Sequence, residues 1–180
     1  MRQTDFRWLV AFGGSFVFLF LAGQVNHYLA DTPLLGTTSY AFLLGLPVAF
    51  AALRLSLGQG LAATLATAMI AEAGLPVPAG MVVLPAATCL CLTHALRINF
   101  NRLNPSSAIA VSLAINFALM LVLTIATGPI AWADSWDRVV VDFVLSQGLV
   151  AALSGWFFSA QISLQRMFGF NLETELREAP

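Results

Sequence analysis

The chain has 180 residues, of which 59% are hydrophobic and only 9% are charged, and its formal net charge is −1. Soluble domains of this length carry about 25% charged residues, so this composition excludes water as the main solvent. The eight basic residues are all arginines, spread along the chain without forming a patch, which argues against nucleic acid as a partner. The composition therefore predicts an integral membrane protein.

Six apolar segments are each long enough to cross a bilayer, which requires about 20 residues. In chain order, the predicted membrane-spanning helices cover residues 8–28, 34–53, 58–75, 80–96, 107–128 and 139–164. The first also has the arginine-bearing head of a secretory signal, but no clear small-x-small cleavage site follows, so we interpret it as an anchor. Pro47 and Pro85 lie inside the second and fourth segments, where loss of a backbone donor predicts kinks.

The distribution of arginines predicts the topology, because loops that remain in the cytoplasm collect positive charge. Seven of the eight arginines precede the first segment or follow the second, fourth and sixth, and only Arg138 lies on the other side. The sequence thus predicts an all-α polytopic bundle that crosses the membrane six times with both termini in the cytoplasm. We expect one transmembrane domain over residues 1–164 and a short cytoplasmic tail over residues 165–180.

Few polar residues within these segments are candidates for function. In the third segment, Gly60, Thr64 and Ala68 share a helix face with Glu72, and such a stripe of small residues allows close approach of another helix. Glu72 is interpreted either as a proton or ligand contact, as intramembrane carboxylates often are, or as an interfacial residue that caps nothing. Because it lies near the water boundary, the sequence predicts that Glu72→Gln leaves folding intact.

The sixth segment contains Asp142, with Ser146 one turn further on and Gln147 beside it. Asp142 is interpreted either as a contact to another subunit or as a solvated interfacial carboxylate, and Gln147 as a hydrogen-bonding group between helices. We expect no catalytic, cofactor or metal site. Cys89 and Cys91 point to nearly opposite faces of a helix, and His94 has no ligand partner at the required spacing.

The order of elements resembles that of the rod-shape-determining MreD family of bacterial inner-membrane proteins. The resemblance covers most of the chain and rests on the second segment ending at Arg54, the glycines of residues 58–60 at the start of a small-residue helix, and a turn before the fourth segment. The final helix, with residues 142–147 and 155–158 and a short amphipathic tail, also resembles that family. Members often carry an aspartate in the third helix, where this chain has Ala68, with Glu72 one turn later.

The resemblance implies a non-catalytic subunit of the bacterial inner membrane that takes part in side-wall peptidoglycan synthesis and cell shape. Its implied partners are an MreC-like protein and, indirectly, a RodA-like polymerase and its transpeptidase. The alternative is the substrate-binding subunit of an energy-coupling-factor vitamin transporter, which has a similar size and helical arrangement. That function requires a ligand pocket at the outer ends of the helices and small residues in the first helix for docking, for which Ala11 and Ser15 are candidates.

Overall fold

The computed structural model describes residues 6–31, 40–75, 77–97, 104–127 and 136–170. Within these ranges the chain forms helices and no strands, so the predicted all-α class is confirmed. The helices are α1 (Arg7–Asp31), α2 (Gly45–Arg54), α3 (Leu57–Ala73), α4 (Val83–Leu96), α5 (Pro105–Thr127) and α6 (Trp136–Met167).

Three of these helices, α1, α5 and α6, are long and apolar enough to cross a membrane. The other three are shorter: α2, α3 and α4 have 10, 17 and 14 residues, which correspond to about 15, 26 and 21 Å of helix. The hydrocarbon core of a bilayer is about 30 Å thick. The structure is therefore that of a helical membrane protein with three long candidate spans, and the predicted six full-length spans are only partly confirmed.

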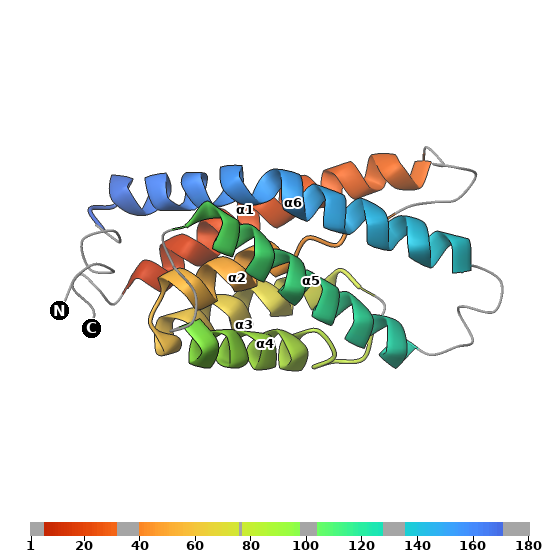
Figure 1. Cartoon of the computed structure of the whole chain (residues 1–180), viewed down its shortest axis with the longest axis horizontal. Coiled ribbons are helices and arrows are strands. Elements are labelled where there is room, and N and C mark those ends of the chain that lie inside the picture. The colour runs from red at the N-terminus through yellow and green to blue at the C-terminus, as the bar shows by residue number, and fades with distance from the viewer. Residues whose placement is uncertain (1–5, 32–39, 76, 98–103, 128–135, 171–180) are drawn as a thin grey trace.

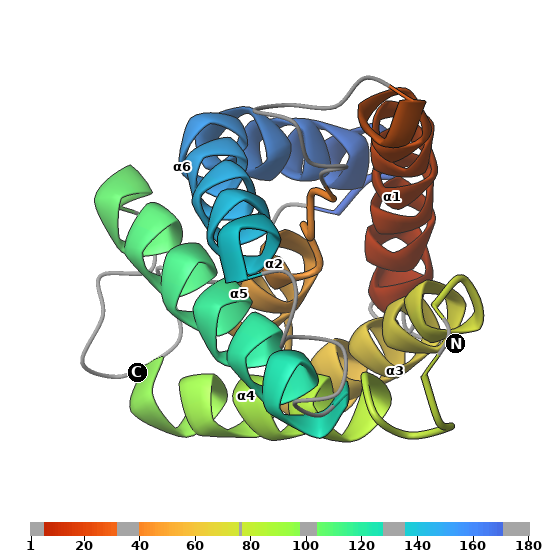
Figure 2. The same ribbon diagram turned by 90° about the vertical axis from the view of Figure 1, so that its right-hand side faces the viewer.

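The short helix α2 lies at the centre of the bundle, with the other helices arranged around it (Figure 2). All ten of its residues are buried, and they pack against α3, α4 and α5. A helix that is apolar on every side is stable only where protein or lipid surrounds it completely. Phe50 of α2 contributes to an aromatic cluster with Phe157 and Phe158 of α6, at ring-centroid distances of 6.3 and 5.4 Å.

The long helices α1 and α6 run antiparallel along one side of the bundle, so that α1 begins where α6 ends (Figure 1). At that end, Gln165 donates a hydrogen bond of 3.0 Å from Nε2 to the Arg7 carbonyl oxygen, and the Arg7 guanidinium lies 5.4 Å from the centre of the Phe170 ring. The sixth helix thus continues to Met167, and Gln165 and Phe170 are buried in the bundle. The remainder of the expected tail, residues 171–180, lies outside the described residues.

The second predicted segment differs most from the structure. We expected a helix over residues 34–53, but α2 begins only at Gly45, and residues 40–43 are not helical; residues 34–39 lie outside the described part. The predicted place of the two prolines inside their helices, on which the expected kinks depended, is also wrong. Pro47 and Pro85 are each the third residue of their helix, where a backbone N–H has no intrahelical acceptor, so proline is tolerated without a kink.

Candidate functional site

Residues 40–43 are not helical and Gly45 is the first residue of α2, so the N–H groups of this stretch have no acceptor within the helix and need others. A buried polar group without a partner costs free energy, and in lipid no water can replace it. Four side chains from three helices act as these acceptors, and we call Asn26, Asn116, Asp142 and Ser146 the polar clamp. They accept from the N–H groups of Ala41 (2.7 Å), Gly45 (3.1 Å), Tyr40 (2.7 Å) and Phe42 (2.9 Å), respectively.

Asn26 forms hydrogen bonds with both backbone groups of Ala41. Its Oδ1 accepts from the Ala41 N–H at 2.7 Å, and its Nδ2 donates to the Ala41 carbonyl oxygen at 2.9 Å. The side chain thereby imitates a neighbouring strand. Because both functions of the buried amide are engaged, Asn26 has little remaining capacity to recognise a ligand.

The start of α2 is held against α5 by close contact at Gly45. A Cβ atom added at Gly45 would lie 2.5 Å from the Asn116 Cβ and 2.7 Å from its Cα, which no side chain can tolerate. This approach brings Asn116 Oδ1 within hydrogen-bonding distance of the Gly45 N–H. The absence of a side chain at Gly45 is therefore a condition for this hydrogen bond.

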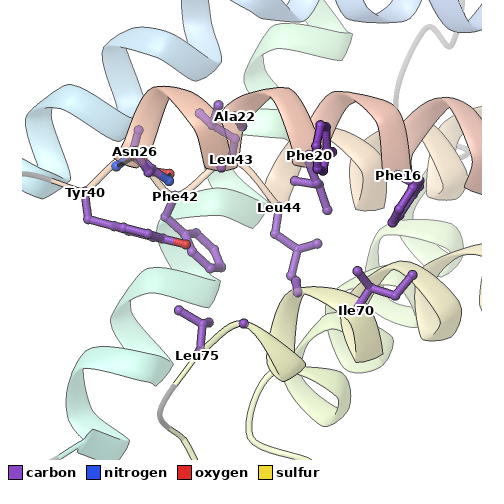
Figure 3. Close-up of a pocket in the computed structure, with 15 residues that line it drawn as sticks. Phe16, Phe20, Ala22, Asn26, Tyr40, Phe42, Leu43, Leu44, Ile70 and Leu75 are labelled. Carbon is purple, nitrogen blue, oxygen red and sulfur yellow. Dashed lines mark hydrogen bonds between the residues drawn. The ribbon is translucent and has the colours of Figure 1, made fainter. Parts of the chain in front are cut away.

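A cavity of about 330 Å³ lies beside residues 40–44, between α1 and α3 (Figure 3). The lining is almost entirely apolar, with Asn26 and Tyr40 as its polar side chains. It consists of Phe16, Leu19, Phe20, Ala22, Gly23, Asn26, Tyr40, Ala41, Phe42, Leu43, Leu44, Ile70, Ala71, Gly74 and Leu75.

The structure gives Asp142 a role that neither sequence interpretation contained. Its Oδ1 accepts from the Tyr40 N–H at 2.7 Å, while its Oδ2 lies 3.8 Å from Nε of Arg138, one turn earlier on α6. The carboxylate thus binds the backbone of this chain at Tyr40 and is not fully solvated. A contact with another subunit remains a prediction.

Glu72 stabilises the start of α4, in contrast to the interpretation that it caps nothing. Its carboxylate accepts from three backbone N–H groups, those of Gly80 (2.6 Å), Val82 (2.8 Å) and Val83 (3.2 Å). The first N–H groups of a helix have no intrahelical acceptor, and negative charge there is favourable. Gly80 has φ of +89°, a backbone conformation that favours glycine, and this turn brings the three donors together.

The small-residue stripe of α3 packs inside the chain. Gly60, Thr64 and Ala68 are all buried. A Cβ atom at Gly60 would lie 3.1 Å from the Ala51 carbonyl oxygen and 3.3 Å from Leu90 Cδ1, so α3 approaches α2 and α4 closely here. The close approach predicted for this stripe is thus made with helices of the same molecule, and a partner contact at these residues stays a prediction.

The remaining polar candidates do not assemble into a reactive site. Both amide atoms of Gln147 are buried and have no hydrogen-bond partner among the residues that the structure describes. His94 Nδ1 lies 3.0 Å from Nη1 of Arg97, which also donates to the Leu55 carbonyl oxygen at 3.2 Å. Over the same described ranges, no group of three histidine, cysteine, aspartate or glutamate side chains could hold a metal ion.

The proposed docking residues of the first helix are buried against α6. Ala11 and Ser15 are almost inaccessible, and Gln161 Nε2 donates to the Ala11 carbonyl oxygen and to Ser15 Oγ, both at 3.2 Å. Gly14 lies under the same amide, since a Cβ there would be 2.8 Å from Gln161 Nε2. This face of α1 is therefore occupied by the protein's own sixth helix.

Sequence reasoning missed the role of Asn26, although a signal for it exists. Asn26 and Asn116 are the only asparagines within the six predicted spans, and both belong to the polar clamp. The cluster Thr37-Thr38-Ser39 before Tyr40 is likewise typical of a break in a helix. These signals do not reveal that both asparagines bind the backbone between Ala41 and Gly45.

The arrangement provides hydrophobic surface and a fixed backbone, and the cavity lining contains no carboxylate, imidazole or thiol. Comparison of the chain with protein-family models, with curated proteins and with solved structures found no match.

Proposed function

We propose that this chain is a non-catalytic scaffold subunit of the bacterial cell-elongation machinery, in the inner membrane. Its partners in this proposal are an MreC-like protein and, through it, a RodA-like polymerase and a transpeptidase. The resemblance of the sequence to the MreD family motivates the proposal. The alternative is the substrate-binding subunit of a vitamin transporter, and the cavity near the ends of α1 and α3 is the observation that favours it.

The observation that carries the proposal is that the polar side chains around residues 40–42 are engaged with the backbone, while the neighbouring cavity has Asn26 and Tyr40 as its polar side chains. A pocket for a polar vitamin needs several polar groups directed at the ligand. Here Asn26, Asp142 and Ser146 instead accept hydrogen bonds from residues 40–42. This use of polar side chains supports a rigid scaffold over a site that recognises a polar substrate.

The first helix provides a second argument against the transport alternative. Docking through small residues requires them on an accessible face, but Ala11 and Ser15 are buried against Gln161 of α6. A transporter subunit with this structure would have to dock through a different surface.

Six crossings with both termini in the cytoplasm are part of the proposal. Successive helices alternate in direction along the bundle (Figure 1), which is compatible with an even number of crossings. The helices α2 and α4 are shorter than the bilayer core. They can still cross it if residues 40–44 and the turn before α4 cover the remaining thickness. Irregular backbone is tolerated at that depth only where protein covers it, as the polar clamp does here.

Co-purification from the native membrane tests the proposed function. Affinity-tagged protein, extracted in mild detergent, is expected to recover an MreC-like protein with the side-wall synthesis enzymes. A tagged six-helix membrane protein from another complex serves as the control. Recovery of a transport ATPase complex instead would establish the alternative. Depletion of the protein is expected to turn rod-shaped cells round, whereas unchanged shape with impaired vitamin uptake would contradict the scaffold proposal.

A further inference from the structure

The cavity beside residues 40–44 lies against a part of α1 that is apolar enough to be in contact with lipid. The part of α1 that lines it, residues 16–26, falls inside the apolar stretch Arg7–Leu29, which is long enough to cross a membrane. Phe16, Phe20 and Ile70 are 42, 59 and 40% exposed, and Figure 3 shows them on the α1 and α3 sides of the cavity. The cavity is therefore continuous with the exposed apolar surface of α1.

The chemistry of the lining restricts what can enter. The N–H groups of Tyr40, Ala41 and Phe42 already donate to the polar clamp, and both amide functions of Asn26 bind Ala41. The Tyr40 hydroxyl is the remaining polar side-chain group of the lining and itself hydrogen-bonds Asn26, so a charged or strongly polar molecule would lose most of its hydration there without replacement. Water is also disfavoured, because apolar cavities remain dry and instead take apolar ligands.

We propose that this cavity binds one hydrocarbon chain of a membrane lipid, which enters from the bilayer between α1 and α3. An acyl chain is the apolar molecule that surrounds this opening at the highest concentration. Its insertion would replace empty space next to Phe42 and Leu43 with van der Waals contacts. The inference does not depend on the proposed scaffold function, since it follows from the break before α2 and the lining of the cavity.

Photocrosslinking tests the inference in the full chain. The protein is reconstituted into vesicles of phosphatidylethanolamine and phosphatidylglycerol that contain a phosphatidylethanolamine with a diazirine in its acyl chain. After irradiation, labelled residues are mapped by mass spectrometry. Phe42 and Leu43 are only 7 and 6% exposed, so their labelling requires a chain inside the cavity. Exposed Val144 on α6 reports ordinary contact with the bilayer.

Gly23→Leu is the variant that fills the cavity. Gly23 belongs to the lining, and a Cβ there would meet nothing within 4 Å, so the backbone accepts a side chain, and we expect the leucine to occupy part of the cavity. Gly155→Leu is the matched control, because Gly155 is also an exposed helical glycine with open space around it but lies outside the cavity. We expect labelling of Phe42 and Leu43 to fall several-fold in Gly23→Leu and to be unchanged in Gly155→Leu, with Val144 labelled equally in both.

Three results would overturn the inference. The first is the absence of label at Phe42 and Leu43 in the wild-type protein when Val144 is labelled. The second is equal labelling of the two buried residues in wild type and Gly23→Leu. The third is loss of the MreC-like protein on co-purification of Gly23→Leu but not of Gly155→Leu, which would identify the occupant as a partner side chain. Failure of the scaffold proposal is recognised separately, by wild-type protein that does not recover its expected partners.

Discussion

Glu72 uses both carboxylate oxygens to hold the backbone at the start of α4: Oε1 accepts from Gly80, and Oε2 accepts from Val82 and Val83. All three partners are donors, so the site requires a group that only accepts hydrogen bonds. A carboxylate meets this requirement, whereas a carboxamide presents an NH₂ group to at least one donor. The position near the end of a helix therefore does not make Glu72 dispensable.

Glu72→Gln is accordingly expected to lower the thermal midpoint of the detergent-solubilised protein by a few degrees, contrary to the expectation from the sequence. The loss comes from a backbone N–H group at or just before the start of α4 that faces an amide donor in place of an oxygen. Thermal unfolding followed by circular dichroism measures the change. Asp137→Asn is the control, since it makes the same change at an exposed position of α6. Equal midpoints for both variants would show that the three hydrogen bonds contribute no stability.

Asn26→Leu is expected to destabilise the protein by about 2 kcal/mol or more, because the Ala41 N–H and carbonyl would both lose their buried partner. Unfolding in mixed micelles with increasing sodium dodecyl sulfate measures this difference. Gln24→Leu removes an exposed amide from the same helix and should change stability by less than about 0.5 kcal/mol. A loss at Asn26 as small as the loss at Gln24 would mean that other acceptors replace the polar clamp.

At the scale of the element, the helix α2 depends on its surroundings. Ten residues are too few for a stable helix in isolation, and its interior contains no charged group until Arg54. Gly45 and Gly60 permit the close approach of α5 and α3, while the polar clamp satisfies the backbone that precedes the helix. The broken second segment is therefore a product of its neighbours as much as of its own residues.

Gly60→Leu tests the packing of α3 on α2. We expect a loss of about 1–3 kcal/mol, because the side chain must displace the Ala51 carbonyl or Leu90. Gly58→Leu is a matched control two residues earlier on the same helix, where a Cβ meets nothing within 4 Å. The same micelle unfolding assay compares the two variants. If Gly58→Leu proved as harmful as Gly60→Leu, the cost would lie in the backbone or the membrane surface rather than in this contact.

At the scale of the whole molecule, the arginines and the alternating helices favour both termini on one side of the membrane. Green fluorescent protein fused to either terminus is expected to fluoresce, while alkaline phosphatase at the same positions should be inactive, because the former requires the cytoplasm and the latter the opposite side. A fusion within residues 129–135 should give the reverse pattern. Termini on opposite sides, or protein that is soluble without detergent, would refute the six-crossing proposal.

The sequence alone determined the class of the protein and most helices, because a segment that must bury its backbone in hydrocarbon is recognisable from apolar residues and sparse charge. The ends of α5, at Pro105 and Thr127, lie within two residues of the prediction. The small-residue stripe at Gly60, Thr64 and Ala68 was also visible as a candidate packing face.

Only the tertiary structure decided how the polar residues are used. Tyr40 and Asp142 are 102 positions apart, and Gly45 and Asn116 are 71 apart, so their pairing depends on how α1, α5 and α6 pack. Hydropathy measures the preference of each residue for lipid, but it carries no information about which side chain reaches which backbone group. For that reason residues 40–42 read as part of a helix, although in the folded molecule side chains of α1 and α6 bind their backbone N–H groups.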